Sequence, residues 1–250
     1  MKKMVKFFST RPLVGELLFC ILVGLGLFAG VMLTWAFPLV TAACLAGLLI
    51  AQWRVGRQPG DDRVMLIAPL LGTPAEMVEV YLGEWTYHAS VLVWGVPLWL
   101  PLVWANLFVL FRRLMRLMLA LLDYFNVWGL GRSILFGSLG GVLLIFCMVA
   151  LFLMEKGPLI IGLYSVVIVF LGSHQLRERD VLIFFVAGIL GAVGEYSAIQ
   201  EGYWHYRNPY FSSLGVDITL PLDWGLSAII INRLADMGQK LDRDREMWQT

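Results

Sequence analysis

Four carboxylate residues in apolar surroundings are the side chains of this sequence with the clearest capacity for chemistry. They are Glu76, Glu195, Asp217 and Asp223. In an apolar cavity, desolvation keeps one carboxyl group protonated while a partner stays ionised, so that one gives a proton and the other accepts it. We therefore predict acid/base catalysis with Glu195 and Glu76 as principal groups and Asp223 or Asp217 assisting.

Aromatic and polar residues close to these carboxylates are the predicted substrate-binding wall. The predicted wall comprises Glu79, Trp85, Tyr87, Tyr196, Gln200, Trp204 and Tyr206. Two other interpretations stay open. The aromatic residues are also typical of the belt that membrane proteins place at the lipid–water interface. The buried glutamates could instead hydrogen-bond indole and phenol groups and simply hold the structure together.

The composition indicates a membrane protein. The chain is 59% hydrophobic and only 15% charged, and its mean hydropathy of +0.77 is too high for a soluble domain of this length. A net charge of +1 offers no basic surface for nucleic acid. The sequence also lacks a glycine-rich phosphate loop and a CxxC pair, so we predict no cofactor and no metal site.

Eight apolar segments approach the length that spans a bilayer. They are residues 13–35, 38–53, 64–82, 89–111, 133–154, 158–173, 181–200 and 214–232. All Lys and Arg residues except Lys156 and Arg207 then fall at the termini or on connections of one side. Under the positive-inside rule, this pattern predicts a multi-pass protein of the bacterial inner membrane with both termini cytoplasmic.

An internal repeat relates the two halves of the chain. The segment "LLGTPAEMVEVYLGEWTYH" (70–88) aligns with "ILGAVGEYSAIQEGYWHYR" (189–207) at a constant offset. The alignment pairs Gly72 with Gly191, Glu76 with Glu195, Gly83 with Gly202, Trp85 with Trp204 and Tyr87 with Tyr206. Further pairs are Pro38 with Pro158, Asp61 with Asp180, Gly95 with Gly215, Pro101 with Pro221 and Trp104 with Trp224.

This repeat predicts an all-α fold of eight transmembrane helices in four-plus-four arrangement. Because four is an even number, the two halves point the same way across the membrane, as in parallel repeats. We predict a first repeat at 1–111, an interfacial linker helix at 112–132, a second repeat at 133–234 and a cytoplasmic polar tail at 235–250.

The repeated glutamates lie on a helical stripe with small residues. Gly72, Glu76, Glu79 and Gly83 step by four, three and four positions and therefore share one face. Small residues let a neighbouring helix approach closely. We therefore expect Glu76, and Glu195 at the same depth, to face protein rather than lipid, where a charge would cost at least ~2.5 kcal/mol.

The run from Glu76 through Trp85 and Tyr87 to "GVPLWLPLVW" (95–104) resembles membrane proteins of carotenoid biosynthesis of the carotenoid hydratase type. The resemblance covers about 40 residues and is weaker around Glu195. It implies a multi-spanning protein that protonates an isoprenoid double bond and adds water to the cation. The sequence "GEWTYH" departs from the glycine-aromatic-glycine run of that family.

Three functions are compatible with these observations. The first is an enzyme that acts on a membrane lipid or isoprenoid, with hydratase- or isomerase-like chemistry. The second is a proton-coupled transporter or flippase, because parallel-repeat transporters place their sites between the halves. The third is a non-catalytic scaffold. The unrepeated Asp217 and Asp223 favour a dedicated site over a symmetric transport path, and the sequence does not indicate an oligomeric state.

Overall fold

The computed structural model describes residues 13–89, 91–125, 130–153, 176–207, 215 and 219–248, and this part of the chain is mostly helical. Its seven helices are α2 (Leu13–Thr34), α3 (Pro38–Gly56), α4 (Asp61–Leu82), α5 (Leu100–Tyr124), α6 (Leu130–Leu153), α8 (Glu178–Gln200) and α9 (Leu220–Trp248). Short strands are β1 (Trp85–Tyr87), β2 (Leu92–Val93), β3 (Val96–Pro97) and β4 (Trp204–Tyr206).

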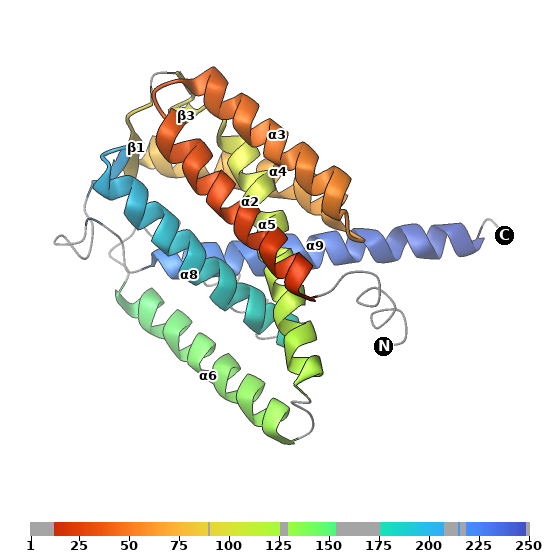
Figure 1. Cartoon of the computed structure of the whole chain (residues 1–250). Helices are drawn as coiled ribbons and strands as arrows, with labels where there is room; N and C mark the ends of the chain where they lie inside the picture. The colour runs from red at the N-terminus through yellow and green to blue at the C-terminus, as the bar shows by residue number, and fades with distance from the viewer. Residues whose placement is uncertain are drawn as a thin grey trace.

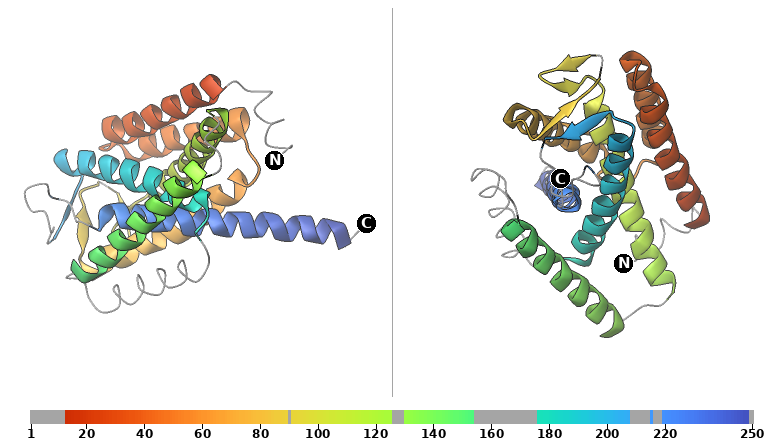
Figure 2. Two further views of the ribbon diagram at one scale, coloured as in Figure 1. Left: turned by 90° about the horizontal axis from the view of Figure 1, so that it is seen from below. Right: turned by 90° about the vertical axis from the view of Figure 1, so that its left-hand side faces the viewer.

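Four helices form the centre of the molecule. Helix α4 packs along α5, and α8 packs along α9. The two pairs meet where α5 contacts α8 and α4 contacts α9. Helices α2 and α3 cover α5, whereas α6 lies at the edge beside α8, and α9 extends past the other helices (Figures 1 and 2).

Equivalent local signals begin and end α4 and α8. The Asp61 carboxylate accepts a hydrogen bond from the Gln58 backbone N–H, and the Asp180 carboxylate accepts one from the Arg177 N–H, each at 2.9 Å. Such bonds satisfy backbone donors at a helix start. After α4, Gly83 has a φ of 77°, a left-handed conformation that favours glycine and ends the helix.

A two-stranded ribbon joins the connections that follow α4 and α8. Strands β1 and β4 are antiparallel, and Thr86 lies opposite His205 at the centre of the register. Side chains alternate between the two faces of a strand. Tyr87 and Tyr206 are accordingly buried, whereas Thr86 and His205 are exposed. We call this end of the molecule the ribbon end (residues 85–87 and 204–206).

Four of the described helices are long and apolar enough to cross a membrane. They are α2, α3 up to Val55, α4 and α8. This result agrees with the prediction of a mostly helical membrane protein. The predicted sixth segment, residues 158–173, lies outside the described residues, and the number of eight spans stays a prediction.

Helix boundaries differ from the predicted ones at two places. Residues 92–97 form the β2–β3 hairpin, so the helix expected from residue 89 begins at Leu100. That helix then continues to Tyr124, and residues 112–124 are its last turns rather than part of a separate linker helix. Helix α9 continues through the polar tail to Trp248, as expected of a tail that extends the last helix. Charged residues do not end these helices, because several of the charges find partners inside the protein.

Candidate functional site

Each of the two repeated glutamates bonds to a tyrosine of the ribbon. The Tyr87 hydroxyl donates to Glu76 Oε2 at 2.6 Å, and the Tyr206 hydroxyl donates to Glu195 Oε2 at 2.7 Å. Both bonds are short, as expected when a hydroxyl meets a carboxylate. The buried face of the ribbon therefore covers both carboxyl groups with hydrogen-bond donors.

A tryptophan lies beside each glutamate. Trp224 Nε1 donates to Glu195 Oε1 at 2.6 Å, so both oxygens of this carboxyl group have a donor. Trp104 lies close to Glu76, but its indole N–H makes no hydrogen bond of normal geometry within the described residues. Glu76 is thus less fully bonded than Glu195.

Two glycines make room for these tryptophans. A Cβ atom on Gly72 would lie 1.9 Å from the Trp104 ring, and one on Gly191 would lie 2.3 Å from the Trp224 ring. No side chain could be accommodated there without displacing the indole. The two indoles also stack on each other, with centroids 5.3 Å apart. The tryptophans therefore fill the space between α5 and α9.

The two carboxyl groups and two phenols form one electrostatic cluster, which we call the Glu–Tyr cluster (Glu76, Glu195, Tyr87 and Tyr206). The charge of each glutamate acts on both tyrosines. Burial, followed by the charge of the neighbouring glutamate, raises the pKa of Tyr87 and of Tyr206 well above the ordinary value. Both phenols therefore keep their proton and act as donors at neutral pH.

The two sides of the cluster differ in exposure and neighbours. Glu76 is buried, whereas Glu195 is partly exposed. Helix α4 adds Thr73 and Glu79 on the face of Glu76, where α8 has Ala192 and Ala198. The Thr73 hydroxyl is buried and has no hydrogen-bond partner among the described residues. The Glu76 side is therefore the more desolvated and the less satisfied of the two.

Of the two aspartates predicted to assist catalysis, the structure describes Asp223 but not Asp217. Asp223 lies in the first turn of α9, where the Thr219 hydroxyl donates to its carboxylate at 3.3 Å. This contact is typical of the start of a helix, and it gives Asp223 a structural role. Asp217 lies outside the described residues. The catalytic assignment of both aspartates stays a prediction.

The predicted substrate-binding residues divide into two groups. Trp85 contacts Tyr206 edge-on with centroids 5.5 Å apart, and Trp204 lies 5.5 Å from Tyr87, so both adjoin the Glu–Tyr cluster. Tyr196 and Gln200 are exposed on α8. Exposure of Tyr196, at 40%, fits contact with lipid or solvent rather than with an internal substrate.

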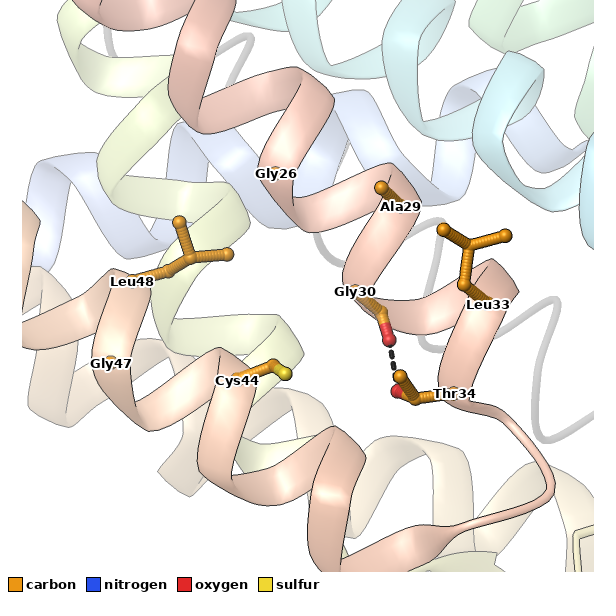
Figure 3. A pocket seen from close by; sticks show the side chains of 8 residues that line it. All are labelled: Gly26, Ala29, Gly30, Leu33, Thr34, Cys44, Gly47 and Leu48. Carbon is orange, nitrogen blue, oxygen red and sulfur yellow. Dashed lines mark hydrogen bonds between the residues drawn. The ribbon is translucent and has the colours of Figure 1, made fainter.

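One cavity of the described residues is lined by α2 and α3 and contains neither of these carboxyl groups. A groove of about 500 Å³ runs between α2 and α3, as Figure 3 shows. Its lining is almost wholly apolar and consists of Gly26, Ala29, Gly30, Leu33, Thr34, Cys44, Gly47 and Leu48. At one end, the Thr34 hydroxyl donates to the Gly30 carbonyl oxygen. The groove carries no titratable carboxyl group and offers no acid/base chemistry of its own.

Sequence analysis missed a buried ion-pair network at the opposite end of the core, which we call the arginine end (Arg112, Arg113, Arg116 and Arg233). Arg113 Nη2 lies 3.3 Å from Asp61, and Arg233 Nη2 lies 2.9 Å from Asp180. Both aspartates are fully buried. The signal was present in the sequence, because Arg113 and Arg233 occupy corresponding positions in the aligned halves and so do Asp61 and Asp180.

One arginine of this network crosses between the two helix pairs. Arg112 is almost completely buried, and its guanidinium donates to Asn232 and, at 2.8 Å, to Asp236 of α9. Its neighbour Arg116 instead donates to Gln58 at 2.7 Å and to the Pro59 carbonyl oxygen. Breaking a buried ion pair leaves an uncompensated charge, so these contacts hold α5 firmly against α4 and α9.

No cluster of three or more metal-ligating side chains lies among the residues that the structure describes. Comparisons with known protein families, curated proteins and solved structures found no significant match to this chain. The resemblance to carotenoid hydratase-type proteins is therefore neither supported nor refuted, and the functional argument rests on the geometry of the Glu–Tyr cluster.

Proposed function

We propose that this chain is an integral membrane enzyme that performs acid/base chemistry on a lipid or isoprenoid. The observation that carries the proposal is a pair of glutamates at corresponding positions, one buried and one partly exposed, each bonded to a tyrosine hydroxyl at 2.6 or 2.7 Å. Paired carboxyl groups with unlike surroundings are the arrangement that separates an acid from a base.

The unlike surroundings assign the two roles. Two donors bond to Glu195 and favour its ionised form. Glu76 is more deeply buried and has one donor of normal geometry, so it is the better proton donor. In a hydration, Glu76 would protonate an alkene carbon, water would bond to the neighbouring cationic carbon, and Glu195 would take the proton that this water releases.

The topology belongs to the same proposal. Eight spans in two parallel repeats, with both termini cytoplasmic, would put Glu76 and Glu195 at one depth between the halves. Corresponding contacts favour this arrangement: Gly72 with Trp104 matches Gly191 with Trp224, and the ribbon pairs β1 with its counterpart β4. In the bacterial inner membrane, the ribbon end would then face outward.

Glutamine substitution tests the acid/base role. Glu76→Gln and Glu195→Gln keep the size and hydrogen-bonding capacity of the side chain but remove the titrating proton. We expect each variant to insert at near wild-type level and to lose at least about 100-fold in activity, the contribution typical of a general acid or base. The measurement is the lipid and isoprenoid profile of expressing cells by mass spectrometry, normalised to protein level.

Glu84→Gln is the matched control, because Glu84 lies on the connection before the ribbon and outside the Glu–Tyr cluster. It should leave the lipid profile of wild-type cells unchanged. A wild-type profile in both Glu76→Gln and Glu195→Gln would contradict the enzyme proposal. Collapse of the protein level in both variants would instead favour a purely structural role for the two carboxyl groups.

A proton-coupled transporter is the second candidate, and one observation favours it. Contacts join the two helix pairs at both ends of the Glu–Tyr cluster, through the β1–β4 ribbon and through Arg112 with Asp236. Closed ends on both sides of a buried site are expected of an occluded transporter. Transport would change where a compound accumulates without changing its chemical structure, so the same mass spectrometry separates the two candidates.

A further inference from the structure

The exposed face of the ribbon carries a pair of histidines that the sequence separates widely. His88 follows β1 and His205 lies at the centre of β4. Thr86 lies opposite His205, so His88 is the diagonal neighbour of His205 on the same face of the ribbon. The two imidazole rings are 4.8 Å apart between centroids, with 47° between their planes, and both side chains are exposed.

This ring separation fits two ligands of one metal ion. Zinc–nitrogen bonds are about 2.0–2.1 Å long, which puts the metal about 3.2 Å from each ring centroid. Two such ligands would have centroids about 4.5 Å apart at a right angle and about 5.2 Å apart at a tetrahedral angle. The observed 4.8 Å lies between these limits.

A second observation concerns the protonation of His88. Its Nδ1 lies 2.9 Å from the Gly202 carbonyl oxygen. A carbonyl oxygen can only accept, so Nδ1 carries the hydrogen and Nε2 of the neutral ring keeps its lone pair. Metal-binding histidines commonly donate their second ring N–H to a backbone carbonyl, which fixes the ring orientation. His88 is therefore oriented as a ligand before any metal arrives.

We propose that His88 and His205 bind one divalent transition-metal ion of the class that prefers imidazole, such as Zn²⁺ or Cu²⁺. Two protein ligands leave the remaining coordination positions to water. Because the histidines come from the two connections that form the ribbon, the metal bridges these connections. Tyr87 and Tyr206 bond to the glutamates from the opposite face of the same ribbon, so the metal stabilises the cover of the Glu–Tyr cluster.

Copper binding to the purified full-length chain tests this proposal. The protein is isolated with an affinity tag that contains no histidine and is titrated with Cu²⁺, and the bound ion is examined by electron paramagnetic resonance. We expect one tightly bound Cu²⁺ per chain, with hyperfine structure from two imidazole nitrogens. Zn²⁺ added to the metal-free wild type should raise its melting temperature, and Cu²⁺ should displace this zinc because imidazole sites bind copper more tightly.

Three variants decide the assignment. His88→Asn and His205→Asn should each weaken Cu²⁺ binding at least tenfold, reduce the coupled nitrogens to one and abolish the stabilisation by Zn²⁺. His174→Asn removes the remaining histidine of the chain and should leave all three measurements unchanged. Equal copper affinity in wild type and in either ribbon variant, or a single coupled nitrogen in the wild type, would overturn the proposal. Such a result in His88→Asn alone or in His205→Asn alone is enough to overturn the proposal.

Discussion

The surroundings of Glu76 and Glu195 contain the same kinds of residue but differ in hydrogen bonding and burial. Each glutamate receives a tyrosine hydroxyl from the ribbon and lies beside a tryptophan that a glycine accommodates. Only Glu195 has donors of normal geometry on both carboxyl oxygens, and only Glu76 is buried. Corresponding positions therefore give the same residue two different hydrogen-bond surroundings and degrees of burial.

The arginine end shows a similar departure from equivalence. Asp61 and Asp180 each accept a backbone N–H at a helix start and pair with an arginine. Asp61 also lies 3.5 Å from Arg116, whose position in the second half is occupied by Asp236. Because the second half has the anion Asp236 where the first half has the cation Arg116, Arg112 of α5 can pair with Asp236 of α9. The differences thus create contacts between the two helix pairs.

Alanine substitution of the two glycines that contact the tryptophans should have the largest effect on stability. Gly72→Ala places a methyl group 1.9 Å from the Trp104 ring, and Gly191→Ala places one 2.3 Å from the Trp224 ring. We expect each variant to lose about 3 kcal/mol or more in the free energy of unfolding, at or above the usual cost of overpacking. Denaturant titration of purified protein in detergent measures this loss.

Gly194→Ala is the control on the same helix as Gly191. Nothing lies within 4 Å of the added methyl group, and alanine favours a helix over glycine by up to about 1 kcal/mol. This variant should be as stable as the wild type or slightly more stable. Equal stability of Gly191→Ala and Gly194→Ala would show that α8 and α9 do not pack as closely as described.

Removal of the tyrosine hydroxyls should have a smaller effect on stability, and the effect should differ between the two tyrosines. Tyr87→Phe removes the hydroxyl that donates to Glu76, whereas Glu195 keeps Trp224 as a donor after Tyr206→Phe. A buried acceptor that loses its partner is costly, so Tyr87→Phe should lose about 2 kcal/mol in the free energy of unfolding and Tyr206→Phe about 1 kcal/mol. The same denaturant titration measures both. The reverse order would contradict the difference that we describe between the two glutamates.

The sequence was sufficient to predict a mostly helical membrane protein and to single out the residues of the Glu–Tyr cluster as a candidate site. Composition indicated membrane helices, and the aligned halves brought Glu76 and Tyr87 to attention together with Glu195 and Tyr206. Hydrogen bonds from phenol and indole groups to these glutamates were one interpretation of the sequence, and the structure specifies them: Tyr87 donates to Glu76, and Tyr206 and Trp224 donate to Glu195. Strands of three residues are too short for their alternation to stand out from an aromatic belt in the sequence.

The remaining differences have specific physical causes. Arg112 and Arg113 resembled the basic end of a membrane helix, but burial against acidic partners lets α5 continue through them. Asp223 lies in the first turn of α9 and contacts Thr219, and its predicted catalytic role stays a prediction. Tertiary partners of this kind are distant in the sequence, so local patterns do not reveal them.

The central claim is that Glu76 and Glu195 form a proton-exchanging pair, and infrared difference spectroscopy tests it without knowledge of the substrate. Purified protein is shifted between acidic and alkaline buffer, and the carbonyl stretch of protonated carboxylic acids is recorded. We expect a titrating band that Glu76→Gln removes and Glu195→Gln shifts, while Glu84→Gln leaves it unchanged. If Glu76→Gln and Glu195→Gln both gave the same spectrum as the wild type, the claim would be contradicted.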